Sequence, residues 1–298
     1  MSRILFYLLL KPLSYLPFSV LYRVSDVLFV LLYRIFGFRT KVVLNNLNNS
    51  FPEKSEEEIN HIAEEFYRHL CDIIVEAIRM FSIPKEELLR RCPVVNPEIF
   101  DHYAAQGKSV LLVAGHYNNW ELAAVACGPQ IVHQTAGIYH PLSNAFMNER
   151  ALESRSRFGL KMISKKEVKP FFEENKDKLT ATMFGADQSP SNSYNAYWTT
   201  FLNQDTAVLF GTEKYAKEYD YPVIFGTITK LRRGYYQMSF HTLEDHPADS
   251  AYGSISEQHT RALEELIIKA PQYWLWTHKR WKRKRPSEME ARPDSTAS

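Results

Sequence analysis

The chain has 298 residues, 45% of them hydrophobic, and a formal net charge of +2 at neutral pH. These values are typical of a globular protein with one large or two small domains, and they exclude recruitment of a polyanionic partner by bulk charge alone. Its three cysteines, Cys71, Cys92 and Cys127, are too few and too widely spaced for a disulfide framework. They predict buried thiols in a reducing compartment.

Residues 1–40 are strongly apolar but are interrupted by charges that include Lys11, Arg23 and Arg34. No uncharged run reaches the roughly 20 residues of a clean membrane span, and no cleavage site of a signal peptide follows. We predict a membrane anchor that lies in the bilayer interface as a helix or helical hairpin, with its basic side chains at the head groups. A tilted span and a helix buried in the protein's own core are the alternatives.

Residues 41–90 show a helical pattern. Ser55 is placed to cap a helix, with Glu58 three residues later as in a capping box, and apolar residues then recur at helical spacing: Ile59, Ile62, Ala63, Phe66, Leu70, Ile73, Ile74 and Ala77. The segment is therefore expected to be mainly helical.

Beyond about residue 108, strand and helix patterns alternate. Strands are expected at 110–114, 135–139, 161–163, 180–184, 221–229 and 235–241, and helices at 121–126, 145–158, 169–175, 207–219 and 256–270. This alternation predicts an α/β domain with a mostly parallel or mixed sheet. We place the domain at residues 41–286, behind the anchor at 1–40 and before a polar, disordered tail at 287–298.

The first candidate site follows the apolar run 110–114, which stops at Gly115 and is followed at once by His116. Glu121 comes five residues later, so the two cannot share one face of a continuous helix. They can meet if His116 lies in a turn and the helix begins near Asn118. A carboxylate behind an imidazole suits general-base activation of a hydroxyl. The alternative is a surface or satisfied core histidine.

Three further segments carry polar groups that can serve a site. Arg150, Arg155 and Arg157 lie on an expected helix and form either a phosphate clamp or a solvated helix face. Asp187 and Gln188 follow the strand at 180–184, so they converge with His116 if the two strands are neighbours; a plain loop is the alternative. Residues 201–211 are expected to open a helix, with free N–H groups or as an ordinary capped helix.

Residues 271–286 combine three tryptophans with six lysines and arginines. This composition fits aromatic and basic anchoring at anionic lipid head groups, binding of nucleic acid, or a solvated helix end. The apolar N-terminus favours lipid. No Gly-rich phosphate loop and no zinc-ligand spacing occurs in the sequence, so we expect no cofactor and no metal.

In combination these segments resemble the bacterial lipid A biosynthesis acyltransferase family, the late or secondary acyltransferases. The resemblance runs from about Arg3 to Pro286 and rests on ordered blocks: Asn46-Leu47, Phe51-Pro52-Glu53, His116-x4-Glu121, Tyr139-His140-Pro141-Leu142 with Asn144, Arg157-Phe158-Gly159, Asp187-Gln188, Phe201–Gly211 and Trp274–Lys282.

The resemblance implies a fold similar to that of glycerol-3-phosphate acyltransferases, a mixed sheet flanked by helices behind N-terminal membrane helices. It implies transfer of a fatty acyl chain from acyl carrier protein, or from coenzyme A, to a hydroxyl of a lipid A precursor at the cytoplasmic face of the inner membrane. Its catalytic pair falls on His116 and Glu121. Family members often carry Arg where this chain has His140, so a phosphate grip there is weakened.

From these motifs we expect His116 to act as general base and Glu121 to hold its other ring nitrogen. Backbone N–H groups of Asn118 and Asn119 are expected to stabilise the oxyanion. Substrate is expected to bind at Asn119, His140, Asn144, Arg150, Arg157, Asp187 and Gln188. The motif holds no Ser or Cys nucleophile, so we expect direct transfer without an acyl-enzyme.

Two other functions fit the sequence. One is the same chemistry on another glycolipid, phospholipid or amino-lipid acceptor. The other is a non-catalytic module that binds membrane or nucleic acid through the basic segment at 278–285; the His-x4-Glu motif at a strand end argues against it, and we expect no nucleic-acid partner.

Overall fold

A computed structural model describes residues 2–286 of the chain. A six-stranded sheet with the order β3-β2-β4-β1-β7-β8 forms its centre. The strands are β1 (Val110–Ala114), β2 (Gln134–Tyr139), β3 (Lys161–Ser164), β4 (Thr180–Gly185), β7 (Val223–Arg232) and β8 (Tyr235–Glu244). All neighbours pair in parallel except β7 and β8, which are antiparallel. The predicted mixed α/β sheet is confirmed, whereas the predicted tail at 287–298 lies outside the described residues.

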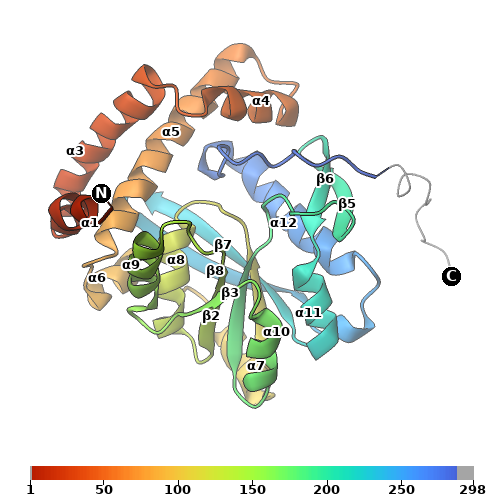
Figure 1. Cartoon of the computed structure of the whole chain (residues 1–298). Helices are drawn as coiled ribbons and strands as arrows, with labels where there is room; N and C mark the ends of the chain where they lie inside the picture. Colours follow the sequence, from red (N-terminus) through yellow and green to blue (C-terminus); the bar gives the residue numbers. More distant parts are fainter. Residues whose placement is uncertain (1, 287–298) are drawn as a thin grey trace.

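Helices cover both faces of this sheet, as Figure 1 shows. They are α7 (Glu98–Ala105), α8 (Trp120–Cys127), α9 (Ala145–Ser156), α10 (Val168–Glu174), α11 (Gly211–Tyr219) and α12 (Ser254–Lys269). Strand β1 has an uninterrupted apolar sequence because it lies between β4 and β7 and is buried on both sides. Leu111 and Val113 pack into one core, and Val110 and Leu112 into the other.

A hairpin of β5 (Ala196–Phe201) and β6 (Gln204–Leu209) stands apart from the main sheet, where we expected a helix from residue 207. That prediction was wrong for Ala207 to Leu209, although α11 follows at Gly211. Leu202 and Asn203 both adopt left-handed backbone angles, with φ of 48° and 63°. Two such residues form the tight turn that matches the twist of a hairpin. The turn carries no glycine, so the sequence offered no strong hairpin signal.

The N-terminal third is helical, as predicted. It comprises α1 (Ser2–Leu5), a π-helical turn at Phe6–Leu10, α2 (Lys11–Ser14), α3 (Phe18–Phe29), a second π-helical segment at Val30–Ile35, α4 (Thr40–Ser50), α5 (Glu56–Arg79) and α6 (Lys85–Arg91). The capping box of Ser55 and Glu58 is present at the start of α5. Within residues 2–286, no helix is both long enough and apolar enough to cross a membrane.

Helix α3 lies along α5 at the outer edge of the molecule (Figure 1). Its inner side is buried, with Phe18, Leu21 and Phe29 each less than a tenth exposed, and the Ser25 hydroxyl donates to Asp72 of α5 at 2.7 Å. The same stretch also carries exposed apolar side chains, among them Val27 and Ile35. The helices at 2–35 therefore have one side that belongs to the protein core and another that is free.

The packing of α3 on α5 makes a testable prediction about stability. We expect Leu21→Ala to lower the free energy of unfolding by about 2–5 kcal/mol, because the side chain is fully buried and its removal leaves a cavity. The neighbouring Val20, 38% exposed, is the matched control, and Val20→Ala should change stability by less than about 1 kcal/mol. Chemical denaturation in detergent measures both; equal effects would mean that α3 does not pack on α5.

Candidate active site

His116 and Asp187 meet at the carboxyl edge of the sheet because their strands are parallel neighbours. Ala114 at the end of β1 is paired with Gly185 at the end of β4, and each functional residue follows two positions later. The imidazole Nδ1 lies 2.6 Å from Asp187 Oδ1. Gln188 Nε2 lies 3.2 Å from the other ring nitrogen, Nε2. The predicted convergence of Asp187 and Gln188 with His116 is therefore confirmed.

Asp187 is buried and receives two further hydrogen bonds. The backbone N–H of His116 donates to Oδ2 at 2.7 Å, and the indole N–H of Trp274 donates to the same oxygen at 2.8 Å. Burial alone would raise the pKa of this carboxyl, but the charge of His116 and the three hydrogen bonds outweigh it and hold the pKa well below the usual range. Asp187 is thus a fixed negative charge behind the imidazole.

His116 is about a fifth exposed, and Nδ1 is the nitrogen that faces the carboxylate. Burial lowers its pKa, yet the charge and hydrogen bond of Asp187 more than compensate, so the pKa of His116 lies above its ordinary value. With the Nδ1 proton held by Asp187, the neutral ring presents the lone pair of Nε2 beside the Gln188 amide. This tautomer suits a general base.

Glu121 does not make the predicted hydrogen bond to the imidazole. It lies in the first turn of α8, where both carboxylate oxygens accept from Arg155 of α9, at 2.9 and 2.6 Å. The pair is near enough for Glu121 to raise the pKa of His116 and for Arg155 to lower it. The position that we expected for Glu121, behind Nδ1, is taken by Asp187. A catalytic role for Glu121 stays a prediction.

Two glycines allow the polypeptide to approach this closely. A Cβ atom on Gly185 would lie 3.1 Å from Cε1 of His116, and one on Gly115 would lie 2.6 Å from a methyl group of Leu263 on α12. A side chain at position 185 would press on the imidazole, and one at 115 would collide with the core. Gly185, the last residue of β4, and Gly115, which directly follows β1, therefore leave room for the close packing at the site.

The expected oxyanion donor at Asn118 is occupied within the protein. Its backbone N–H donates to the Tyr273 carbonyl at 2.9 Å, and its side chain donates to the Ile228 carbonyl at 2.7 Å. Asn118 also has φ of 54°, in the left-handed region where asparagine is one of the tolerated residues. The expectation that its N–H binds an oxyanion was wrong, and the residue instead fixes the turn after His116.

The other residues expected to bind substrate occupy varied positions. Asn119 is buried, where its side chain caps α8 through the Leu122 N–H at 2.9 Å and donates to Glu76. Asn144 caps α9 through the Met147 N–H at 3.0 Å. His140 is exposed, with Nδ1 beside its neighbour's carbonyl. The contacts of both asparagines are those of helix caps, and substrate binding at all three stays a prediction.

The three arginines of the expected phosphate clamp point to different partners. Arg150 forms ion pairs with Glu149 and Glu153 of its own helix, whereas Arg157 donates to the carbonyls of Met80 and Ile83 at 2.6 and 3.0 Å. Only Arg155 pairs with a residue of the His-x4-Glu motif. Arg157 ties the end of α9 to the segment after α5, so the structure gives it a structural contact, and phosphate binding stays a prediction.

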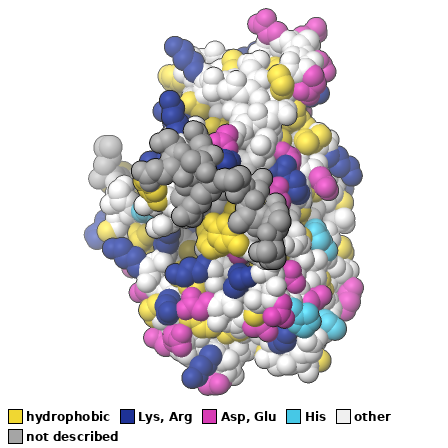
Figure 2. All heavy atoms as spheres, turned by 90° about the vertical axis from the view of Figure 1, so that its right-hand side faces the viewer, with side chains coloured by type: hydrophobic (Ala, Val, Ile, Leu, Met, Phe, Trp, Pro, Cys, Tyr) yellow, Lys and Arg dark blue, Asp and Glu magenta, His cyan; other side chains and the backbone are white. Residues whose placement is uncertain are grey.

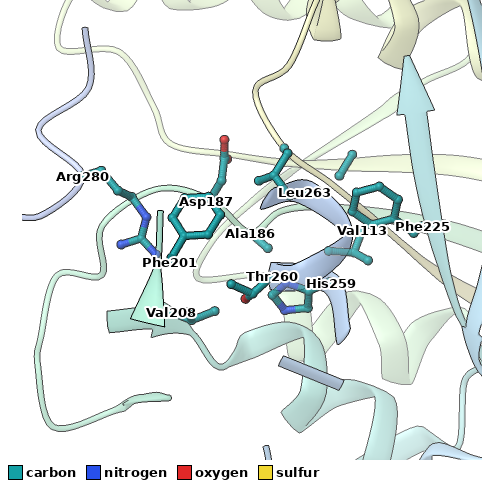
Figure 3. A pocket seen from close by; sticks show the side chains of 12 residues that line it. Val113, Ala186, Asp187, Phe201, Val208, Phe225, His259, Thr260, Leu263 and Arg280 are labelled. Atoms are coloured by element: carbon teal, nitrogen blue, oxygen red, sulfur yellow. The ribbon is translucent and has the colours of Figure 1, made fainter. Parts of the chain in front are cut away.

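Behind the His116–Asp187 pair lies a small internal pocket, about the size of one water molecule, shown in Figure 3. Phe201, Leu263 and Val113 form part of its apolar lining, and its buried polar members are Asp187, His259, Thr260 and Arg280. Burial lowers the pKa of His259 to about 4. The imidazole of His259 is therefore neutral near pH 7, and Asp187 has His116 as its ion-pair partner.

The tryptophans of residues 271–286 do not form the expected surface anchor. Trp274 and Trp276 are almost fully buried, and the indole of Trp274 is a hydrogen-bond donor to Asp187. Lysines and arginines on the face shown in Figure 2 are interspersed with acidic side chains. The segment after Trp274 instead packs beside the site: the Ser189 N–H donates to His278 Nε2 at 3.0 Å, and Arg283 donates to the Pro190 carbonyl. Trp274 is a site residue that sequence reasoning missed.

These observations define an α/β protein with a histidine–aspartate pair at the carboxyl ends of parallel strands. In the described part of the chain, the side-chain partners of the imidazole nitrogens are Asp187 and Gln188, so the base has no hydroxyl or thiol nucleophile attached. Such an arrangement has the features of a general base for a hydroxyl group.

The chain belongs to the bacterial lipid A biosynthesis acyltransferase family, whose pattern matches residues 3–283. It is similar to the lipid A biosynthesis lauroyltransferase of Escherichia coli, with 25% identity over 278 residues, which are 93% of this chain and 90% of the relative. It is also similar to the lipid A biosynthesis palmitoleoyltransferase of E. coli and to a lipid A biosynthesis acyltransferase of Shigella flexneri. Each is 23% identical over 82% of this chain and 79% of the relative. The protein is an acyltransferase, as the sequence motifs predicted.

The geometry predicts how His116 titrates. Because Asp187 favours the imidazolium, the ring of the wild-type protein should protonate with a pKa above about 6.5. In Asp187→Asn that charge is lost while burial remains, so the pKa should fall below the wild-type value. NMR titration of the imidazole signals, assigned with His116→Ala, measures both. A pKa that is unchanged in Asp187→Asn would contradict the pairing.

Proposed function

We propose that the protein transfers a fatty acyl chain from an acyl carrier protein thioester, or from coenzyme A, to a hydroxyl of a lipid A precursor. The observation that carries this proposal is the His116–Asp187 pair, a partly exposed imidazole whose Nδ1 faces the carboxylate and whose Nε2, beside the Gln188 amide, is the nitrogen left to take up a proton. The E. coli and Shigella relatives carry names of lipid A acyltransferases, which supports the choice of acceptor.

In the proposed reaction, Nε2 of His116 removes the proton of the acceptor hydroxyl as its oxygen attacks the thioester carbonyl. The tetrahedral intermediate collapses with cleavage of the C–S bond, and the imidazolium returns the proton to the leaving thiolate. Asp187 stabilises the imidazolium between these steps through its charge and its short hydrogen bond to Nδ1. The acyl group passes directly from donor to acceptor, because no hydroxyl or thiol of residues 2–286 is hydrogen-bonded to the His116 ring.

Glu121 contributes in this scheme without touching the imidazole. Its carboxylate lies near enough to stabilise the imidazolium electrostatically, and it holds the Arg155 guanidinium beside the site through two hydrogen bonds. Arg155 is then placed to bind an anionic group of donor or acceptor. This role replaces the orienting hydrogen bond that the spacing of the motif suggested.

Activity assays distinguish these roles. We expect His116→Ala to lower the transfer rate by about 10²–10⁴-fold, the usual contribution of a general base, and Asp187→Asn to lower it strongly. Glu121→Gln should cost less than His116→Ala, because it keeps the shape but loses the charge. The assay follows the mass of an under-acylated lipid A precursor incubated with an acyl carrier protein thioester and the detergent-solubilised enzyme.

The exposed His102 on α7 provides a control, and His102→Ala should leave the rate unchanged. Full activity of His116→Ala would refute the proposed base. A gain of one acyl chain on a phospholipid, amino lipid or other glycolipid, but not on the lipid A precursor, would keep the chemistry and change the acceptor.

We further propose that the exposed apolar side of residues 2–38 rests in the membrane interface at the cytoplasmic face of the inner membrane, where a lipid acceptor is within reach. The exposed apolar side chains are Ile4, Leu5, Tyr7, Leu8, Leu9, Tyr15, Val20, Val27, Val30, Leu31, Ile35, Phe36 and Phe38. Such a run of apolar groups on one segment is more than isolated surface residues. Nearby basic residues such as Lys11 and Arg34 suit anionic head groups.

Binding to vesicles tests this membrane contact. Ile35→Ser with Phe36→Ser removes two side chains that are 63% and 73% exposed, so it should leave stability nearly intact and weaken vesicle binding by at least about 10-fold. Ile268→Ser on α12, 59% exposed, is the matched control and should bind as wild type. Co-sedimentation with vesicles that contain anionic lipid measures both, and equal binding by all three proteins would refute the proposed contact.

A further inference from the structure

Glu76 is a buried carboxylate on α5 that lies directly behind the catalytic turn. Only 1% of the residue is exposed. Its Oε1 accepts a hydrogen bond from the hydroxyl of Tyr22 at 2.9 Å, and its Oε2 accepts from the hydroxyl of Tyr236 at 2.9 Å. The third donor is the side-chain amide of Asn119, 2.5 Å from Oε2. The three donors come from α3, β8 and the start of α8.

This carboxylate has no ion-pair partner within residues 2–286, which is unusual for a buried acidic group. Burial and the neighbouring charge of Asp72 raise the pKa of Glu76 to about 7. A methionine or leucine, with apolar partners in place of the three donors, would fill the same space without burying a charge. The position therefore calls for an explanation other than packing.

Asn119 links Glu76 to the site. Its Oδ1 accepts from the Leu122 N–H and so caps α8, while its Nδ2 donates to Glu76. The residue stands three positions after His116, in a turn where Asn118 adopts a left-handed backbone. Asp187 holds His116 at one end of this turn, and Tyr273 and Ile228 hold Asn118. The hydrogen bond to Glu76 fixes Asn119 at the other end of the turn.

We propose that Glu76 is a positioning residue for acyl transfer, which fixes the turn that carries His116 by holding the side chain of Asn119. The inference rests on the proposed function, because its kinetic readout is transfer by His116. Through Tyr22 the same carboxylate joins the turn to α3, whose exposed side chains belong to the proposed membrane contact.

The first test compares three variants. Glu76→Met keeps the approximate length but offers no acceptor, so we expect kcat to fall by about 10–100-fold, with KM within about threefold of wild type. Glu76→Gln should stay within about threefold of the wild-type kcat. Its amide oxygen can accept from Asn119 and Tyr236, and its NH₂ can donate to Tyr22.

Tyr236→Phe is the matched control. It removes a hydrogen bond to the same Oε2 atom, from a donor that does not belong to the catalytic turn. We expect it to lower thermal stability while kcat remains within about threefold of wild type. A kcat for Glu76→Met equal to that of wild type, or an equal loss in Tyr236→Phe, would overturn the proposal.

A second test, needed if Glu76→Met fails to fold, exchanges the donor and the acceptor of the hydrogen bond between positions 119 and 76. Asn119→Asp keeps the cap on α8 but places two carboxylates in contact, so kcat should fall by at least about tenfold. In the double variant Asn119→Asp with Glu76→Gln, the glutamine NH₂ can donate to the new carboxylate at position 119, and kcat should recover by at least about fivefold. Absence of recovery would overturn the role of this hydrogen bond.

Amide hydrogen exchange separates this inference from the proposed function, because it needs no substrate. In a peptide that spans residues 115–124, exchange should be faster in Asn119→Asp than in wild type or Tyr236→Phe, and slower again in the double variant. Unchanged exchange in all of them would refute the hold of Glu76 on the turn. If the wild-type protein transferred no acyl chain, the proposed function would be wrong. The exchange measurement would still show whether Glu76 holds the turn.

Discussion

The parallel pairing of β1 with β4 is the constraint on which the site depends. Because Ala114 and Gly185 are register partners, the chain leaves both strands at the same level, and two residues later His116 and Asp187 are within 2.6 Å of each other. Each residue of the pair is thus positioned by one of two neighbouring strands in the middle of the sheet, of which β1 is buried on both faces. A rigid support of this kind is what a base of fixed tautomer requires.

Several neighbouring groups then fix the orientation of the His116–Asp187 pair. Trp274 and the backbone of His116 hold Asp187, and the glycine at the end of each strand leaves room for close packing. The C-terminal segment thereby acts as part of the site, although its tryptophans suggested a membrane surface. Burial makes each of these contacts stronger, and it also makes each unpaired group more costly.

Much of the fold could be predicted from the sequence, because apolar runs and turn residues mark buried parallel strands. The meeting of Asp187 with His116 was also predictable, since carboxyl ends of neighbouring strands share one edge. The partner of Nδ1 was assigned to Glu121 instead, because five residues separate it from His116 whereas 71 separate Asp187. Which carboxylate reaches the ring depends on strand order and side-chain direction. The β5–β6 hairpin was not predicted, because its turn residues, Leu202 and Asn203, do not include the glycine that usually marks such a turn.

Helix α5 connects the core, the turn after His116 and the helices of the proposed lipid contact. Helix α5 packs against α3 through apolar side chains and the Ser25–Asp72 hydrogen bond, and it presents Glu76 to the cap of α8. In the proposed function, a lipid acceptor has to pass from the membrane to His116, whose side chain is only about a fifth exposed. That proposal requires a defined distance between the proposed membrane contact and the turn that carries His116. Helix α5, which is 24 residues long, packs against α3 and accepts the hydrogen bond of Asn119 in that turn, so in this proposal it sets that distance.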